Sequence, residues 1–134
     1  MSQHNLDLIR AIYAALAAGD IPGVVSRMSP DIVWNEAESF PLADRNPYRG
    51  PDAILGGVFA RLAAEWDGFA AVPEELLDAG DTIVALGRYR GTHRTTGQPL
   101  NAQMVHVWRV QDGKAAAFQQ YVDTLHAARA SGAA

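Results

Sequence analysis

The spacing of apolar residues divides the chain into a helical first half and a stranded second half. Over residues 6–18 the apolar side chains recur every three or four positions, which is the period of an amphipathic helix. The same period returns over residues 51–66, and Pro51 suits the first turn of that helix. From residue 69 to residue 122 apolar and polar positions alternate, which is typical of half-buried strands.

Capping residues mark the ends of the helices. Gly19 closes the first helix, and Asp20 is a suitable N-cap for a second, short helix that ends at Met28. A loop rich in Pro, Asp and Asn, residues 37–50, separates an early strand from the third helix. Asp123 is suited to cap a short C-terminal helix, and a carboxylate near a pocket mouth is the alternative role for it.

Five strands are predicted, one before the third helix and four after it. The early strand, DIVWNE at residues 31–36, places Ile32, Trp34 and Glu36 on one face. The later strands are residues 69–77, residues 82–93, the strand that bears His106, and the strand after Asp112-Gly113. Pro73 indicates an edge position or a bulge in the first of these. The order α-α-β-α-β-β-β-β predicts a single α+β domain over residues 1–134, in which the helices cover one face of a curved antiparallel sheet.

Asp112-Gly113 is the two-residue turn of a tight hairpin, and it sets which residues face each other. Counting from this turn, the sequence predicts that His106 faces Gln119 and that Met104 faces Tyr121. That face combines large apolar side chains with a few polar groups, as ligand pockets do. The predicted substrate-binding residues are Trp34, Phe40, Tyr48, Phe59, Met104, Trp108, Gln119, Tyr121 and Asp123. For the aromatic members a purely structural role in the core is the alternative.

The opposite face of the sheet has an apolar centre with arginines around it. Arg88, Arg90 and Arg109 surround a group of apolar residues that comprises Val84, Leu86, Val105, Val107, Phe118 and Val122, with Gln120 also on this face. An apolar patch with a polar rim is typical of a subunit interface, so a homodimer through this outer face is predicted.

Composition excludes several classes of function. The 134 residues carry a net charge of −4, so nucleic acid is not expected as a partner. The chain has no cysteine, which excludes disulfides and thiolate chemistry and fits a cytoplasmic location. No signal-peptide pattern, membrane-length apolar run, metal-ligand spacing or nucleotide-binding motif is recognisable. Neither a metal nor a cofactor is therefore expected, and neither is a membrane partner.

Three segments together resemble a known family. They are YAALAAGD at residues 13–20, DIVWNE followed by YRGPDAI at residues 48–54, and HVWRVQDGK at residues 106–114 with the ending QYVDT. The chain resembles the nuclear-transport-factor-2-like (NTF2-like) superfamily, and within it the SnoaL-like, ketosteroid-isomerase-related group. The resemblance implies a cone-like curved sheet wrapped around a pocket. It places Glu36 where such an isomerase keeps its proton-moving carboxylate, and His106 where it keeps its oxyanion-stabilising acid. Ile12, beside Tyr13, falls at the position of the isomerase's oxyanion tyrosine.

Glu36 and His106 are the predicted catalytic residues. A glutamate that points into an apolar cavity acquires a raised pKa and suits proton transfer near neutral pH, whereas a solvated rim position is the alternative. His106 is predicted to polarise a substrate oxygen, with a core histidine satisfied by Gln119 as the alternative. The leading hypothesis is a cofactor-independent enzyme that acts on a small apolar carbonyl compound as an isomerase or cyclase does. The alternatives are a small-ligand binding protein without turnover and an interaction module that works through its outer sheet face.

Overall fold

Helices α1 (Ser2–Ala17) and α2 (Ile21–Val25) open the computed structural model, which describes residues 2–134. Between them Gly19 adopts a positive φ of 70°, a conformation that favours glycine. The side chain of Asp20 accepts a hydrogen bond from the backbone N–H of Gly23, which confirms the predicted N-cap. Helix α2 is shorter than predicted because Met28 already belongs to the first strand.

The third helix is one continuous helical stretch with a wider turn in its middle. It consists of α3 (Pro51–Ile54), the π-helical turn η2 (Leu55–Phe59) and α4 (Ala60–Glu65). Gly57 in this turn packs closely against the ring of Tyr48, where a Cβ would lie 2.3 Å from a ring carbon. The loop before the helix contains the 3₁₀ turn η1 (Pro41–Arg45) and a two-residue strand, β2 (Tyr48–Arg49), which the sequence pattern did not predict.

Six strands form one curved sheet in the order β2-β1-β6-β5-β4-β3. The further strands are β1 (Met28–Asn35), β3 (Trp66–Ala79), β4 (Thr82–His93), β5 (Pro99–Gln111) and β6 (Lys114–Val122). Neighbouring strands are antiparallel except for the parallel pair β1 and β6. Strand β3 lies at the edge and its register shifts between Pro73 and Glu75, so both alternatives that Pro73 indicated, an edge position and a bulge, are present. The predicted α+β fold is confirmed, with β2 added at the other edge.

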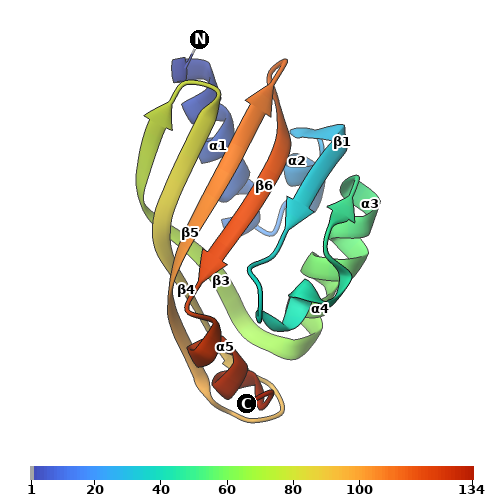
Figure 1. Cartoon of the computed structure of the whole chain (residues 1–134), viewed down its shortest axis with the longest axis vertical. Coiled ribbons are helices and arrows are strands. Elements are labelled where there is room, and N and C mark those ends of the chain that lie inside the picture. The colour runs from blue at the N-terminus through green and yellow to red at the C-terminus, as the bar shows by residue number, and fades with distance from the viewer. Residues whose placement is uncertain (1) are drawn as a thin grey trace.

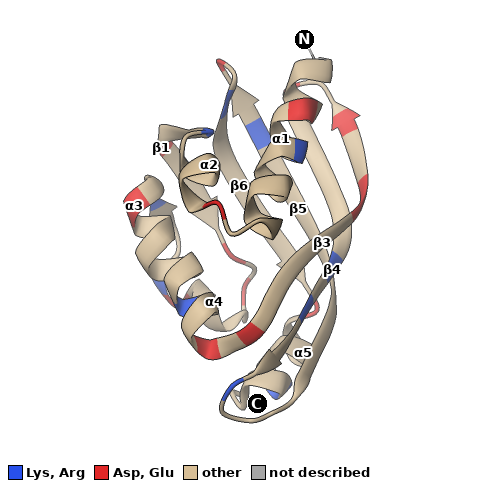
Figure 2. Cartoon of the chain, turned by 180° about the vertical axis from the view of Figure 1, so that it is seen from behind, with Lys and Arg blue, Asp and Glu red and all other residues tan. Residues whose placement is uncertain are grey.

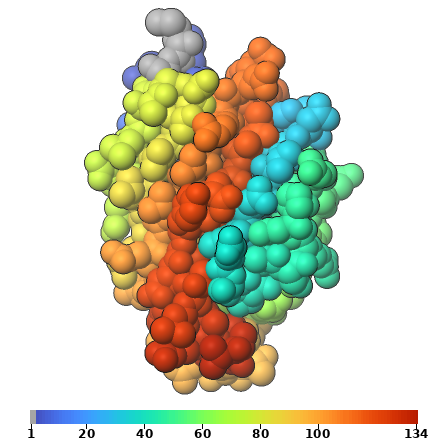
Figure 3. All heavy atoms as spheres, viewed as in Figure 1, coloured from blue at the N-terminus to red at the C-terminus, as the bar shows by residue number. Residues whose placement is uncertain are grey.

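Helices α1, α2 and α4 cover one face of this sheet (Figures 1 and 2). Figure 2 shows α1, α2 and α4 in front of the strands, whereas Figure 3 shows β4, β5 and β6 open to solvent on the other side. The C-terminal helix α5 (Thr124–Ser131) packs at the end of the sheet. Asp123 accepts a hydrogen bond from the backbone N–H of His126, so its predicted role as a helix cap is confirmed.

The hairpin between β5 and β6 corrects the predicted register. Asp112 and Gly113 form the turn with φ of 52° and 73°, and Gln111 faces Lys114 as predicted. Beyond this pair, however, β6 contains an extra residue, Ala116, because Val110 faces Ala115 and Arg109 faces Ala117. Such a bulge moves every later side chain to the other face.

The shifted register exchanges the six residues from Ala117 to Val122 between the two faces of the sheet, so Val122 also lies on the inner face and not on the predicted outer face. His106 faces Gln120 instead of Gln119, and Met104 faces Val122 instead of Tyr121. Phe118 and Gln120 are consequently buried under the helices, and the prediction that they lie on the outer face is wrong. The side chains of Gln119 and Tyr121 lie on the outer face, and 56% of Tyr121 is exposed.

Candidate functional site

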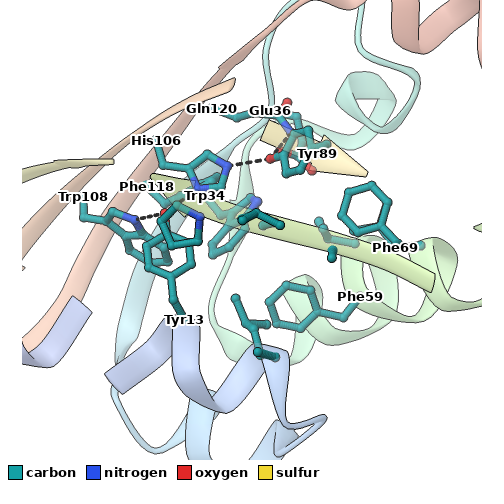
Figure 4. A pocket seen from close by; sticks show the side chains of 18 of the residues that line it. Tyr13, Trp34, Glu36, Phe59, Phe69, Tyr89, His106, Trp108, Phe118 and Gln120 are labelled. Carbon is teal, nitrogen blue, oxygen red and sulfur yellow. Dashed lines mark hydrogen bonds between the residues drawn. The ribbon is translucent and has the colours of Figure 1, made fainter. Parts of the chain in front are cut away.

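A cavity of about 620 Å³ lies between the concave face of the sheet and the helices α1, α2 and α4. Its wall is largely apolar and includes Trp34, Phe40, Phe59 and Trp108, four of the predicted substrate-binding residues. Glu36 and His106, the two predicted catalytic residues, line the same cavity (Figure 4). The sequence analysis assigned these two side chains to one pocket, and in the structure both line the same cavity.

Five predicted substrate-binding residues lie outside the cavity wall. Gln119 and Tyr121 are on the outer face because of the bulge, and Asp123 caps α5. Met104 is buried in the sheet but does not reach the cavity. Tyr48 is also buried, and its hydroxyl donates a hydrogen bond to the backbone carbonyl of Leu42. The structure therefore places these five side chains away from the cavity that holds Glu36 and His106.

Glu36 follows directly after β1 and is almost completely buried, with 3% of its surface exposed. Burial raises the pKa of its carboxyl group to about 8, and the Trp34 indole and the more distant charge of Arg61 offset this only in part. Among the described residues no group hydrogen-bonds Oε2 of Glu36 or the indole nitrogen of Trp34. This end of the cavity wall therefore holds one buried acceptor and one buried donor whose hydrogen bonding the described residues do not satisfy.

His106, in the middle of β5, has both ring nitrogens occupied. Its Nδ1 lies 2.6 Å from the hydroxyl oxygen of Tyr13 on α1, and its Nε2 lies 2.5 Å from that of Tyr89 on β4. Burial lowers the pKa of the imidazole to about 3, so His106 is neutral at neutral pH. Tyr13 and Tyr89, rather than the predicted Gln119, are thus the hydrogen-bond partners of this ring.

The hydrogen bonds continue on both sides of His106 (Figure 4). The indole N–H of Trp108 donates to the hydroxyl of Tyr13 over 3.0 Å, and the amide nitrogen of Gln120 donates to the hydroxyl of Tyr89 over 2.8 Å. Burial raises the pKa of both tyrosines, so both hydroxyls keep their protons at neutral pH. We call Trp108, Tyr13, His106, Tyr89 and Gln120 the hydroxyl network.

Sequence reasoning missed Tyr13 and Tyr89 as functional candidates. Tyr13 belongs to the apolar stripe of α1, and the position implied for an oxyanion tyrosine was Ile12, which is completely buried and does not line the cavity. Tyr89 lies on the inner face of β4 together with Ile83 and Ala85. The alternation of residues along this strand already placed it on that face, so the sequence contained a signal for it. Phe118 and Gln120 were missed for another reason, since only the bulge brings them to the cavity.

The site offers carboxyl, phenol, imidazole, amide and indole groups. Within residues 2–134 no three histidine, aspartate or glutamate side chains are placed to hold a metal ion. In the same range no helix combines the length and the apolar character that a membrane crossing requires.

Comparison with known proteins identifies the family. The sequence model of the SnoaL-like domain matches residues 9–118, which include Tyr13, Glu36 and His106. The chain belongs to the SnoaL-like family. This confirms the resemblance that its motifs indicated, and the SnoaL-like fold includes polyketide cyclases and isomerases. No curated protein matches the sequence.

Solved structures place this SnoaL-like chain among NTF2-like proteins. An NTF2-like protein from Burkholderia thailandensis is 41% identical, with 92% of this chain and 94% of that chain covered and a TM-score of 0.88. TerC, co-crystallised with polyporic acid, is 26% identical over 96% of this chain and 98% of its own, with a TM-score of 0.85. IdmH, a putative polyketide cyclase from Streptomyces antibioticus, is 23% identical over 94% and 96%, and its TM-score of 0.78 shows the shared fold.

Proposed function

We propose that this protein is a cofactor-independent enzyme that moves a proton next to the carbonyl group of a small apolar compound. The observation that carries the proposal is the meeting of two unlike groups in one apolar cavity. Glu36 supplies a desolvated carboxyl group, and the hydroxyl network supplies donors for an oxygen atom. Proton abstraction beside a carbonyl needs these two parts, a base and an oxyanion partner.

Glu36 is the proposed proton carrier. With its pKa raised to about 8, roughly one carboxyl in ten is ionised at pH 7, so the base and the acid form are both populated. A group whose pKa lies near the working pH is present in both its acid and its base form. It can therefore accept a proton in one step and give it up in the next. Glu36 can therefore take a proton from one carbon and return it to another.

The proposed oxygen donor is a tyrosine hydroxyl and not the imidazole itself. Both nitrogens of His106 are occupied by Tyr13 and Tyr89, so the ring has no free position for a ligand. The two tyrosines line the cavity, and their hydroxyls hold their protons because burial raises their pKa. His106 accordingly supports the donor, which modifies the direct contact that the sequence suggested for it.

The cavity supports an apolar ligand of moderate size. Its volume falls in the range of pockets that hold drug-sized molecules, and most of its wall is aromatic or aliphatic. Two similar structures agree with this ligand class, since TerC was crystallised with polyporic acid and IdmH is described as a putative polyketide cyclase. The substrate is therefore proposed to be an apolar carbonyl compound, with its polar end near Glu36.

Exchange of carbon-bound hydrogen tests the proposal. Wild-type protein in D₂O is incubated with 2-tetralone and with 2-acetylnaphthalene, and deuterium uptake beside each carbonyl is followed by NMR. We expect uptake above the buffer rate for at least one ketone, and a reduction of about 10²- to 10⁴-fold in Glu36→Gln. Glu38→Gln is the matched control because Glu38 is exposed two residues further on. It should behave as the wild type.

A negative result distinguishes the alternative. If both ketones bind, as followed by quenching of the tryptophan fluorescence, but neither exchanges above the buffer rate, the catalytic proposal is wrong. The same cavity then supports a non-catalytic protein that binds small apolar ligands. Binding that is equally tight in wild type and Glu36→Gln would favour this alternative further.

We also propose that two copies of the chain associate through the outer sheet face. Val84, Leu86, Val105 and Val107 are only half-buried on β4 and β5, and Figure 3 shows these strands exposed on this side. Ala117, Gln119 and Tyr121 join this face after the register correction, and Arg88, Arg90 and Arg109 surround it. An apolar face of this kind on a sheet is stabilised by burial against an identical face.

A further inference from the structure

The cavity wall carries a carboxyl group and no cationic side chain that could pair with it. Among residues 2–134, Glu36 is the only acidic residue that lines the cavity, and no lysine or arginine lines it. Oε2 of Glu36 has no hydrogen-bond partner among the described residues. Arg61, whose charge acts on Glu36, lies outside the wall and forms an ion pair of 2.9 Å with Asp44. A buried carboxylate is ordinarily paired with a positive charge, so the cavity lacks half of such a pair.

Aromatic rings form much of the wall around this carboxyl group. Eight phenylalanine, tyrosine and tryptophan side chains line the cavity, and Figure 4 shows several of them around the hollow beside Glu36. They also hold one another in place. The ring of Phe59 is perpendicular to Trp34 at a centroid distance of 5.7 Å, and Phe69 lies 5.1 Å from Tyr89. The face of an aromatic ring attracts a cation within about 6 Å of its centroid, so the wall favours positive charge even beyond the carboxyl group.

The hydrogen-bond acceptors of the wall indicate which kind of cation fits. Apart from Glu36, the side-chain acceptors belong to the hydroxyl network, whose members already bond to one another. The remaining oxygen, Oε1 of Gln120, accepts a hydrogen bond from the backbone N–H of Ala37 over 3.0 Å. A primary ammonium group brings three N–H donors that need acceptors, and an inorganic cation needs several oxygen ligands. A quaternary ammonium ion has no N–H, so it needs only a counter-charge and ring faces.

We propose that this cavity also binds an organic quaternary ammonium compound, with its charged nitrogen beside the Glu36 carboxylate and its apolar substituents against the aromatic wall. A volume of about 620 Å³ accommodates such an ion together with an attached apolar group. The net charge of −4 attracts cations to the protein. This binding requires no reaction of the ligand, so it does not rest on the proton-transfer function. The cation and a ketone substrate compete for the same space at Glu36.

Binding of the cation is linked to the ionisation of Glu36. Burial raises the pKa of its carboxyl group to about 8, so about nine-tenths of these groups are protonated at pH 7. A cation beside the carboxyl group favours its ionised form, and the proton is released when the cation binds. Because few carboxyl groups are still protonated at pH 9, the apparent affinity should rise about tenfold from pH 7 to pH 9.

The other titratable groups on the wall do not change their charge in this pH range. They are Tyr13 on α1, Tyr89 on β4 and His106 on β5, whereas the lining residues of α2, η2, α4, β3 and β6 carry no titratable side chain. Burial raises the pKa of both tyrosines and lowers that of the imidazole to about 3. A quaternary ammonium ion has no proton to lose. The pH dependence of its binding therefore reports on Glu36.

Benzyltrimethylammonium and neopentylbenzene test the proposal, because these two molecules have the same shape and differ in charge. Titration calorimetry at pH 7 and pH 9, in two buffers of different ionisation enthalpy, measures the affinity and the number of protons released. We expect the cation to bind about tenfold more tightly at pH 9, and to release about 0.9 proton at pH 7 and about 0.1 at pH 9. Neopentylbenzene should not bind more tightly at pH 9 and should release no proton.

Glu36→Gln keeps the size of the side chain and removes its charge. It should weaken binding of benzyltrimethylammonium at pH 9 by at least about tenfold, abolish the pH dependence, and leave binding of neopentylbenzene little changed. Glu38→Gln, at an exposed position, is the matched control and should behave as the wild type. The proton count on the wild type needs no variant, so the proposal stays testable even if Glu36→Gln does not fold.

Three results would overturn the proposal. They are a cation that binds no more tightly than neopentylbenzene at pH 9, binding at pH 7 without proton release, and a pH dependence that persists in Glu36→Gln. The exchange of deuterium into ketones is a separate measurement. Cation binding with proton release but without ketone exchange supports this site and refutes only the proton-transfer function. Ketone exchange without cation binding has the opposite meaning.

Discussion

Replacing Glu36 by glutamine removes a carboxylate whose ionised form is destabilised by burial in the cavity. The burial of Glu36 determines how much this replacement changes the free energy of unfolding at each pH. The ordinary pKa of a glutamate is 4.5, and burial raises that of Glu36 to about 8. The folded protein thus binds this proton more tightly than the unfolded chain does. The resulting stabilisation is fully present below pH 4.5 and is lost as the pH rises through 8. The total loss is about 5 kcal/mol, of which about 3 kcal/mol has occurred by pH 7.

Glu36→Gln keeps the size of the side chain and cannot ionise, so its stability should lack this loss. We expect the free energy of unfolding of Glu36→Gln to exceed that of the wild type at pH 9, and the difference to grow by several kcal/mol between pH 4.5 and pH 9. An unpaired amide in the cavity costs about 1–3 kcal/mol at every pH, which shifts the whole curve without changing its slope. Urea unfolding at five or six pH values measures the difference, with Glu38→Gln as the control.

The difference between variant and wild type is the diagnostic quantity, because His106 acts in the opposite direction. Burial lowers its pKa from 6.5 to about 3, so the folded state binds this proton more weakly, and stability falls as the pH drops below 6.5. The contribution of His106 is common to both proteins and cancels in the comparison. A constant difference between wild type and Glu36→Gln from pH 4.5 to pH 9 would refute the reasoning.

Two further predictions concern the outer face and the C-terminal helix. Val107→Asp places a charge in the centre of the outer face, so it should convert a dimer into a monomer in sedimentation experiments. Gln111→Asp, at the exposed end of the hairpin, is the control and should leave the dimer intact. A wild-type protein that sediments as a monomer would contradict the proposed interface. Asp123→Ala removes the cap of α5 and should lower the free energy of unfolding by about 1 kcal/mol in urea, without changing ligand binding, because Asp123 lies outside the cavity wall. A loss of ligand binding with an unchanged free energy of unfolding would instead show that Asp123 contributes to ligand binding.

Local sequence signals predicted most of the architecture because each has a local physical cause. Asp20 and Asp123 cap helices with their own side chains, and Asp112-Gly113 closes a hairpin through its positive φ values. The alternation in β1 placed Trp34 and Glu36 on the inner face, where both line the cavity. These features depend on a few neighbouring residues, so the sequence alone predicts them.

The remaining features depend on contacts between distant segments. Ala116 sits in a run of three alanines, and nothing in such a run marks the extra residue that forms the bulge. One unpaired residue was enough to move Gln120 into the site and Gln119 out of it. The partners of His106 come from α1 and β4, which are 93 and 17 positions away, so only the folded chain identifies Tyr13 and Tyr89.

Titration of the Glu36 carboxyl group is the most direct test of the central claim that this group is buried in an apolar cavity beside the hydroxyl network. Protein with ¹³C-labelled glutamate side chains is followed by NMR from pH 3 to pH 10, with the Glu36 signal assigned by its absence in Glu36→Gln. The structure predicts a midpoint near pH 8 for this carboxyl. A midpoint near 4.5, the ordinary value, would show that water reaches Glu36 and would contradict the account.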